Sequence, residues 1–294
     1  MEIEGIVTAL VTPLTEDFQI DEQGLRMTVE RQVQAGLNGV LMLGGTGEFA
    51  ALSREQRQKA VQIAVNQVAG RVPVIAGVLT TGFNECLIHC RAFERAGADA
   101  LLVLTPYYIS PSQEGMVDYF QRVDKEVNAP VMIYNIPYRT GVNILPETVE
   151  VIVRSTQHIC GIKECCPDLG QSAELIRRMD SRFIMMSGEE SLCLSALLLG
   201  AKGGIMATCN VFPNFWVKVY ALVRSGHYSE AQEMFLAYLP LIKALFRESN
   251  PGPIKYAMRK MGLPAGYPCT PIPEVPTKAT RELIDNLLTE RGLI

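Results

Sequence analysis

Lys163 ends a short apolar run, Ile159 to Ile162, just past the middle of the chain. Most lysines lie at the surface of a protein, so a surface position at the exit of a strand is the ordinary interpretation. If the amine is buried instead, desolvation disfavours its charged form. A neutral amine is a nucleophile that attacks a carbonyl group. The position of Lys163 therefore leads to the hypothesis of a Schiff-base lysine.

Other residues that bind anions or move protons also follow apolar runs. The turn from Gly44 to Gly47 is by default only flexible, but it also suits a nest of backbone N–H groups, at the start of a helix, that binds a carboxylate or phosphate. Packing is the more common fate of tyrosines such as Tyr107-Tyr108, Tyr134 is explained equally well as a core residue, and Arg139 as half of a surface ion pair. Brought together at one site, these groups suit an anionic carbonyl substrate that meets an amine, with phenols to transfer protons.

Eight continuous apolar runs of β type alternate with segments of helical period. The runs lie at about 5–11, 39–43, 72–78, 99–104, 130–134, 159–163, 182–187 and 203–208. Continuous apolar character is typical of parallel strands that are covered on both faces. Eight β/α units in about 225 residues predict a (β/α)8 TIM barrel. A doubly wound sheet is disfavoured because no G-x-G-x-x-G motif follows the first run.

The predicted domains are the barrel, residues 1–225, and a C-terminal helical region, residues 226–294, packed on it. Ser53 with Gln56 resembles a capping box, and Pro146 and Pro213 suit the first turns of helices. Active sites of such barrels lie at the carboxyl ends of the strands. Since the glycine-rich turn, the tyrosines, Arg139 and Lys163 all follow predicted strands, we expect them at one rim.

Composition and charge exclude several classes of protein. A net charge of −4 argues against non-specific binding of nucleic acid. The N-terminus lacks the features of a signal peptide, and no apolar run is long enough to cross a bilayer, so we expect a cytoplasmic protein with no membrane partner. The eight cysteines are expected to be reduced, and Cys86, His89 and Cys90 lack the further ligands that zinc needs, so no metal is expected.

The chain resembles a family of class I pyruvate-dependent aldolases, the dihydrodipicolinate synthases and N-acetylneuraminate lyases. The resemblance runs from Gly5–Pro13 to Asn250–Lys255. It rests on the order and spacing of G-x-T-G-E, T-P-Y-Y, Y-N-x-P-x-R-T-G, G-I-K-E and S-G-E/D-E/D. The combination is highly specific, although no single motif is.

The resemblance implies that Lys163 forms a Schiff base with pyruvate and that no metal or organic cofactor is needed. Tyr134 would shuttle protons, and Thr46 with the neighbouring backbone at Gly45 would hold the pyruvate carboxylate. Arg139 would face the carboxylate of the second substrate at the site entrance. Gly188 and Ile205 would line the pyruvate pocket. Tyr108 matches a tyrosine that family members contribute to the site of a neighbouring subunit, which implies a homodimer or homotetramer.

Three functions remain open. Arg139 favours the synthase branch, which condenses pyruvate with the small aldehyde aspartate semialdehyde. However, Gly45 replaces the hydroxyl residue that completes a proton relay between two tyrosines in the synthases, and Glu48-Phe49 resembles relatives that act on keto-deoxy sugar acids. The alternative enzyme is therefore a lyase or dehydratase of a 2-keto-3-deoxy acid. A non-catalytic homologue that binds a keto acid is the third candidate, and the presence of both Lys163 and Tyr134 argues against it.

Overall fold

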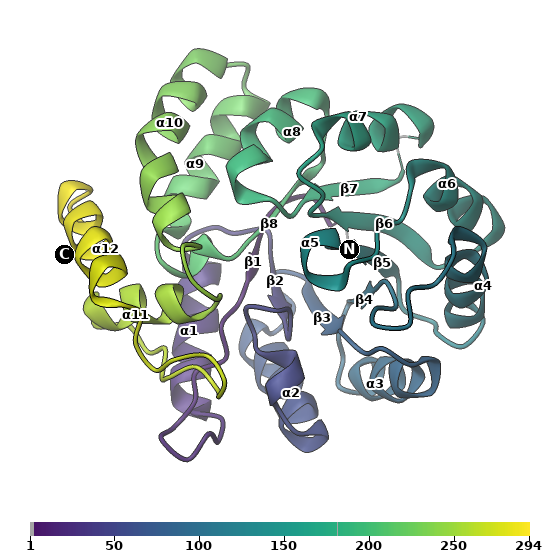
Figure 1. Cartoon of the computed structure of the whole chain (residues 1–294), viewed down its shortest axis with the longest axis horizontal. Helices are drawn as coiled ribbons and strands as arrows, with labels where there is room; N and C mark the ends of the chain where they lie inside the picture. The colour runs from purple at the N-terminus through teal and green to yellow at the C-terminus, as the bar shows by residue number, and fades with distance from the viewer. Residues whose placement is uncertain (1–2, 181) are drawn as a thin grey trace.

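The structure is a computed structural model that describes residues 3–180 and 182–294. In these residues, eight parallel strands close into a barrel, because each strand pairs with the next and β1 pairs with β8 (Figure 1). The strands are β1 Gly5–Ala9, β2 Gly39–Met42, β3 Val74–Val78, β4 Ala100–Leu104, β5 Val131–Asn135, β6 Ile159–Glu164, β7 Ile184–Ser187 and β8 Gly203–Met206. The prediction of a (β/α)8 barrel is confirmed.

Helices surround the barrel, which buries the strands on both faces. The helices of the β/α units are α1 Glu22–Gln34, α2 Arg54–Val68, α3 Phe83–Arg95, α4 Gln113–Asp124, α6 Pro146–Ser155, α7 Leu169–Arg178, α8 Cys193–Leu199 and α9 Pro213–Arg224. Short helical turns lie in the connections on the carboxyl side of the strands: η1 Phe49–Ala51, α5 Pro137–Thr140, η2 Glu190–Leu192 and η3 Thr208–Asn210. These turns occupy the part of the chain in which the chemistry was predicted.

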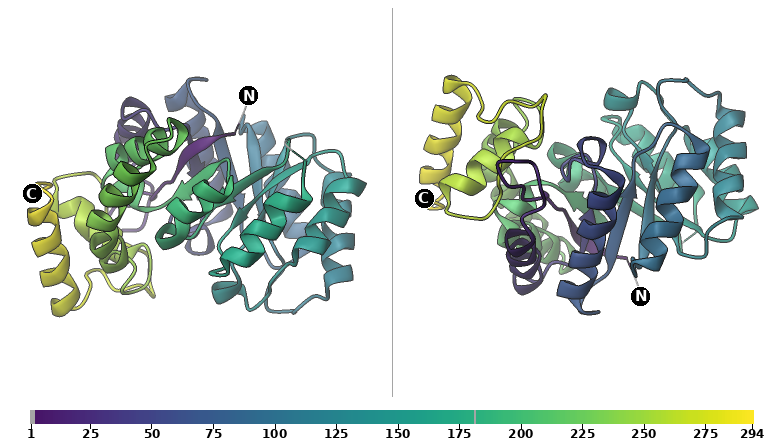
Figure 2. Two further views of the ribbon diagram at one scale, coloured as in Figure 1. Left: turned by 90° about the horizontal axis from the view of Figure 1, so that it is seen from above. Right: turned by 90° about the horizontal axis from the view of Figure 1, so that it is seen from below.

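The chain after α9 forms three further helices, α10 Tyr228–Ala244, α11 Gly252–Lys260 and α12 Lys278–Glu290. Figure 2 shows them together on one side of the barrel, where α10 packs on α9, and α12 packs on α10 and α11. Their buried side chains share one hydrophobic cluster with the barrel interior, from Leu41 and Tyr134 to Trp216 and Ile284. The C-terminal helices are therefore continuous with the core that surrounds the barrel mouth.

The local helix signals have the predicted effect. The hydroxyl of Ser53 accepts a hydrogen bond from the N–H of Gln56, whose side chain accepts one from the N–H of Ser53, so the capping box at α2 is confirmed. Pro146 and Pro213 begin α6 and α9. No helix in the described ranges has both the length and the apolar character needed to cross a membrane.

Where the strand boundaries differ from the ends of the apolar runs, they do so by one or two residues. β1 ends at Ala9 although Leu10 and Val11 are fully buried, because the N–H of Val11 donates to the side chain of Asn210 rather than to a strand. At the opposite side of the barrel, β5 and β6 continue to Asn135 and Glu164. The extension pairs Asn135 with Glu164, one residue beyond the pair Tyr134 and Lys163.

Candidate active site

Lys163 and Tyr134 are register partners on the adjacent strands β6 and β5, at the carboxyl end of the barrel. Only 6% of Lys163 is exposed, and its Nζ lies 4.6 Å from the centre of the Tyr134 ring. Burial lowers the pKa of Lys163 below its ordinary value, and burial raises the pKa of Tyr134. The pair therefore favours a neutral amine beside a protonated phenol, which is the combination that imine chemistry requires.

Glu190, from η2, is a buried carboxyl group at the same cavity. It accepts hydrogen bonds from the N–H groups of Ala207 and Thr208 and from the Thr208 hydroxyl, which in turn accepts one from the indole N–H of Trp216. Burial raises the pKa of Glu190 to about 7, against the effect of these hydrogen bonds. Its negative charge favours the ammonium form of Lys163, whereas burial of the lysine opposes that form more strongly.

The glycine-rich turn between β2 and η1 is fixed by contacts with distant segments. Glu48 forms a buried ion pair with Lys255 of α11, with 2.5 Å between Oε1 and Nζ, and accepts a hydrogen bond from the N–H of Cys269. Thr46 is 5% exposed, and its hydroxyl accepts a 2.8 Å hydrogen bond from the side chain of Asn250. The C-terminal region thus sets the position of the turn that was expected to bind a carboxylate.

The turn differs in one respect from the predicted nest of N–H groups at a helix start. The N–H groups of Glu48 and Phe49 donate within the turn, to the carbonyls of Gly45 and Gly44, because the chain enters a short 3₁₀ turn rather than α2 directly. Those two donors are committed to the turn. An anion is therefore expected to be bound by residues 45–47 and the Thr46 hydroxyl.

Gly45 faces open space at the mouth of the barrel. A Cβ atom built at this position has Arg139 Nη1, 3.8 Å away, as its nearest neighbour outside the adjacent residues, and the backbone of Gly45 is not left-handed. A larger residue would therefore fit here without backbone strain. Two neighbouring cavities meet at this position, because Gly45, Tyr134 and Arg139 line both of them.

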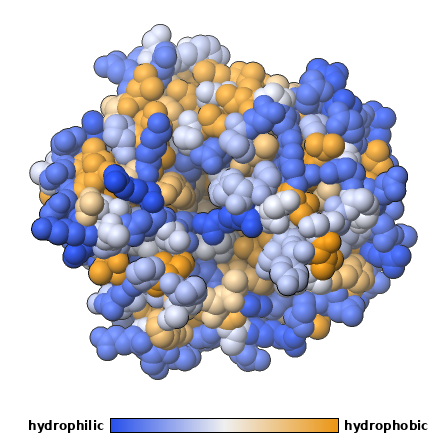
Figure 3. Space-filling view, in the orientation of Figure 1, coloured by the Kyte–Doolittle hydropathy of each residue, from blue (hydrophilic) through white to orange (hydrophobic). Residues whose placement is uncertain are grey.

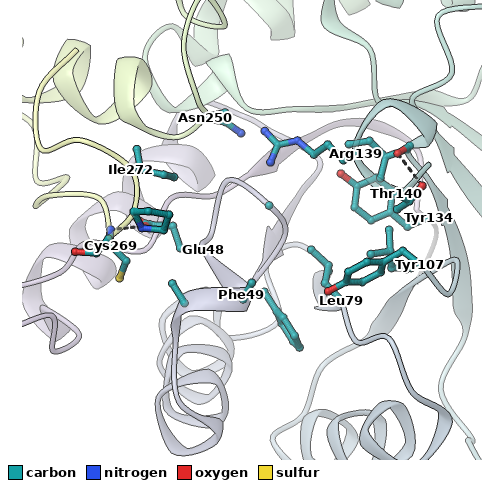
Figure 4. Close-up of a pocket in the computed structure, with 17 residues that line it drawn as sticks. Glu48, Phe49, Leu79, Tyr107, Tyr134, Arg139, Thr140, Asn250, Cys269 and Ile272 are labelled. Atoms are coloured by element: carbon teal, nitrogen blue, oxygen red, sulfur yellow. Dashed lines mark hydrogen bonds between the residues drawn. The ribbon is translucent and has the colours of Figure 1, made fainter. Parts of the chain in front are cut away.

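The first of these cavities is small, about 40 Å³, and contains the amine. The predicted site residues that line it are Gly45, Thr46, Tyr134, Arg139, Lys163, Gly188 and Ile205. The second cavity, about 260 Å³, is lined mainly by apolar side chains, among them Phe49, Leu79 and Tyr107. Figure 4 shows these three side chains, with Arg139 and Asn250 pointing toward one another above them. In Figure 3 the same face of the molecule has hydrophilic and hydrophobic residues mixed around a central hollow.

The structure does not bring Tyr108 to this cavity. Its side chain is 91% exposed, and its backbone has φ 70°, a left-handed conformation that is costly for a tyrosine. The preceding residue, Tyr107, lines the apolar cavity instead. A role for Tyr108 in catalysis therefore requires the site of another subunit, as the family resemblance implies.

Three residues that the structure brings to the site were not predicted from the sequence. Asn250 lines both cavities, and its Oδ1 is buried without a hydrogen-bond partner in the described part of the chain. Glu190 lies within the S-G-E-E motif, which was its only signal. Cys165, two residues after Lys163, lines the small cavity. Every second residue of a strand lies on the same face, so the spacing of Cys165 from Lys163 was the signal that could have predicted this position.

Comparisons with known proteins find relatives over nearly the whole chain. The model of the dihydrodipicolinate synthetase family matches residues 2–290. The 4-hydroxy-tetrahydrodipicolinate synthase of Methanopyrus kandleri is 38% identical over 294 residues, which cover 100% of this chain and 98% of that protein. The same enzyme of Methanocaldococcus jannaschii is 35% identical, with 99% of each chain covered. The crystal structure of dihydrodipicolinate synthase from Thermotoga maritima has a TM-score of 0.96 at 34% identity and covers 99% of each chain.

The buried Glu48–Lys255 pair yields a prediction about stability. Lys255→Met leaves the Glu48 carboxylate buried beside an apolar side chain, and the loss of one partner of such a pair costs about 3–5 kcal/mol of unfolding free energy. Lys278 and Glu282 form an exposed pair and supply the control, since Lys278→Met should cost less than about 1 kcal/mol. Urea unfolding of both variants measures the difference. Equal, small losses would show that the buried pair does not hold the turn.

Proposed function

The chain belongs to the dihydrodipicolinate synthetase family, and we propose on this basis that it is a 4-hydroxy-tetrahydrodipicolinate synthase, which condenses pyruvate with aspartate semialdehyde. The observation that carries the proposal is the buried amine of Lys163, 4.6 Å from the ring centre of Tyr134 at the ends of adjacent strands. Reductive trapping of the pyruvate imine tests the covalent step, and turnover of pyruvate with aspartate semialdehyde tests the assignment as a synthase. In this proposal the enzyme works in the cytoplasm and uses no metal or organic cofactor.

The reaction begins when the neutral amine of Lys163 attacks the carbonyl carbon of pyruvate. The addition product loses water, and Tyr134 supplies the proton that the departing hydroxide needs, because its raised pKa keeps the phenol protonated. The resulting iminium withdraws electrons from the pyruvate methyl group, which loses a proton to give an enamine. The enamine carbon then attacks the aldehyde. Covalent catalysis thus divides one difficult condensation into several easier steps.

The positions of the other site residues support this sequence of steps. Thr46 and the backbone of Gly45 are placed to bind the pyruvate carboxylate, and Gly188 and Ile205 shape the cavity around the imine. Arg139 borders both cavities, so its guanidinium is placed to meet the carboxylate of the aldehyde as it enters. Under this assignment one anionic group is held deep in the site and the other at its rim.

Assembly is part of the proposal. Tyr108 is too exposed to serve its own site, and we assign it to the site of a partner subunit in a homodimer, which can pair further into a homotetramer. The apolar cavity beside Phe49 and Tyr107 lies open in the single chain. This cavity borders Gly45, so the tyrosine of a partner subunit could approach Tyr134 through it.

A second function, action on a 2-keto-3-deoxy acid as a lyase or dehydratase, is favoured by one specific observation. The space at Gly45 is continuous with the apolar cavity, so a substrate larger than aspartate semialdehyde has room beside Tyr134. Such a substrate would form the same imine on Lys163. The two functions therefore differ in the carbonyl partner and not in the covalent chemistry.

The first prediction from the proposed function tests the Schiff base. Wild-type protein incubated with pyruvate and borohydride should gain one reduced pyruvyl adduct, located by mass spectrometry on Lys163. Lys163→Ala removes the amine, and Lys163→Arg replaces it with a guanidinium that stays protonated, so neither variant should be trapped. Lys218→Ala, an exposed residue of α9, should be trapped like wild type. An adduct on another lysine would overturn the assignment.

The second prediction concerns pH. The neutral amine is the nucleophile, so the trapping rate should rise as the pH rises through the pKa of Lys163. Because burial lowers that pKa from its ordinary value of 10.5, the rate should reach its plateau well below pH 10.5. Single-turnover trapping measured between pH 6 and 11 gives the profile. A midpoint near pH 10.5 would mean that the amine is solvated in the working enzyme.

The third prediction concerns the shared site. Tyr108→Phe subunits and Lys163→Ala subunits should each be inactive alone, because one lacks the phenol and the other the amine. After subunit exchange, mixed dimers contain one site with both groups and should recover part of the activity. Native mass spectrometry confirms the exchange. Exchanged but inactive mixtures would show that Tyr108 serves its own subunit, and full activity of Tyr108→Phe alone would show that it serves no site.

The fourth prediction concerns Gly45. Gly45→Thr fits the open space and adds a hydroxyl between Tyr134 and the partner's tyrosine, so the protein should fold normally and be trapped by pyruvate. For a synthase, kcat with aspartate semialdehyde should rise, by less than about 10²-fold, since general acid–base assistance is worth about 10²–10⁴-fold in total. If turnover of a 2-keto-3-deoxy acid is lost instead while trapping persists, the second function is supported. Unchanged rates on both substrates would show that the hydroxyl has no part in either reaction.

A further inference from the structure

The connection between β5 and α6, residues 136–145, is a loop that carries Arg139 and has a closed neck. Asn135, at the end of β5, closes this neck with both atoms of its amide. Its Nδ2 donates to Asn143 Oδ1 over 2.8 Å, and its Oδ1 accepts a hydrogen bond from the N–H of Ile144 over 3.3 Å. Between these ends the chain makes the short helix α5. Arg139 thus lies on a short loop that returns to its own starting point.

An amide and a carboxyl group attach this neck to the barrel. Gln171, which is buried on α7, pairs reciprocally with Asn143: Asn143 Nδ2 lies 2.9 Å from Gln171 Oε1, and Gln171 Nε2 lies 3.1 Å from Asn143 Oδ1. The same Nε2 lies 3.1 Å from Oε2 of Glu164, the last residue of β6. Glu164 also accepts hydrogen bonds from Asn135 Nδ2 and from the N–H of Cys166. The network therefore joins the neck of the loop to β6 and α7.

The centre of this network is the carboxyl group of Glu164, which is 2% exposed. Within the described part of the chain no basic side chain forms an ion pair with it, and its partners are two side-chain amides and a backbone N–H. Burial raises the pKa of Glu164 to about 7, and the hydrogen bonds from Cys166, Gln171 and Asn135 act to lower it. Buried polar networks whose members are satisfied make the segments that they join rigid. We therefore expect this network to fix the orientation of the loop.

Asn135 and Glu164 lie on the opposite face of the sheet from the reacting groups. They are register partners, one residue beyond Tyr134 and Lys163, and adjacent residues of a strand point to opposite faces. Tyr134 and Lys163 line the small cavity, so Asn135 and Glu164 face the surrounding helices, where Gln171 of α7 meets Glu164. The amine and the phenol are held by the strands of the barrel, and a change in the network on the other face should leave them in place.

The guanidinium of Arg139 depends on this loop for its position. The backbone N–H of Arg139 donates to the carbonyl of Ile136 over 3.0 Å, but within residues 3–180 and 182–294 its side chain forms no hydrogen bond or ion pair. It lines the small cavity, the apolar cavity and a third cavity, of about 400 Å³, that extends to Lys243 of α10. The orientation of the loop therefore determines which of the three cavities the guanidinium faces.

We propose that Gln171 and Asn143 are positioning residues for Arg139: by fixing the neck of its loop, they orient the guanidinium toward the carboxylate of the incoming aldehyde. The inference rests on the proposed function, which assigns that carboxylate to Arg139. Neither Gln171 nor Asn143 lines any of the three cavities, so neither touches the substrate. They act on the binding of the second substrate, and the imine on Lys163 forms without them.

Gln171→Ala tests the proposal through a split between two kinetic quantities. It should raise KM for aspartate semialdehyde by about 2- to 10-fold, the range of one hydrogen bond. The rate of reductive trapping with pyruvate and kcat should match wild type, because a change in ground-state binding alone moves KM and not kcat. The side chain of Gln113 on α4 still donates to the carbonyl of Asn143, which keeps the loop attached. Asn143→Ala removes the other half of the amide pair and should shift KM in the same way.

Gln32→Ala is the matched control. Gln32 is also a buried glutamine on a helix of the barrel, and its Oε1 accepts a 3.0 Å hydrogen bond from the hydroxyl of Thr8. The same substitution there removes a buried hydrogen bond that has no connection to the loop of Arg139. Its KM, kcat and trapping rate should match wild type.

A double variant shows whether the amides act through Arg139. Arg139→Ala removes hydrogen bonds to a charged group and should raise KM for aspartate semialdehyde by about 10- to 100-fold. In that background Gln171→Ala should have no further effect on KM, because there is no guanidinium left to orient. Residues that act independently would give additive effects instead. Circular dichroism melts verify that each variant is folded, and Asn143→Ala decides the question if Gln171→Ala does not fold.

The outcomes are distinguishable from those of the proposed function. If wild-type protein does not condense pyruvate with aspartate semialdehyde, the proposed function fails, and the inference fails with it. If wild-type protein turns over but the folded Gln171→Ala and Asn143→Ala variants keep the wild-type KM, the role of the amides is overturned while the proposed function stands. The same holds if Gln171→Ala raises KM by the same factor with and without Arg139.

Discussion

Desolvation of one amine is the constraint on which the site depends. Lys163 can be buried because its strand ends at the mouth of a closed barrel, where the side chain points into a small cavity rather than into solvent. The same burial disfavours the ammonium form, so the fold itself prepares the nucleophile. Glu190 and Arg139 act on the amine in opposite directions, and both reach the cavity from connections that follow strands. The barrel thus favours the neutral amine of Lys163 through the position of this residue, before any substrate binds.

The C-terminal region is an integral part of this arrangement. Both side chains of the ion pair between Glu48 and Lys255 are buried. Because a buried charge without its partner would be strongly unfavourable, the glycine-rich turn and α11 hold each other in place. Asn250, just before α11, hydrogen-bonds to Thr46 and lines both cavities. A region that resembles an appendage in the sequence therefore completes the side of the cavity that Thr46 lines.

Two glycines at the site, Gly188 and Gly45, differ in what surrounds them. Gly188 is small because the sulfur of Cys165 and the stem of Lys163 fill the space beside it, and an added methyl group would collide with both. Gly45 is small with nothing in the space that it leaves, which opens the cavity toward Phe49 and Leu79. The first glycine permits dense packing around the imine. The second leaves the site wider on the side of the apolar cavity.

The sequence alone determined the barrel and most of the residues at its rim. Continuous apolar runs are buried on both faces, so they specify parallel strands, and the residues that follow them must meet at one end of a closed barrel; this reasoning placed Lys163, Tyr134, Thr46 and Arg139 together. Only the tertiary structure decided what surrounds them. Asn250 and Lys255 are more than 200 residues away from Thr46 and Glu48 along the chain, and no local pattern links them. Which side chains surround Tyr134 and how much space Gly45 leaves depend likewise on packing between segments, because burial and hydrogen bonding at the site are set by contacts between residues that are distant in the chain.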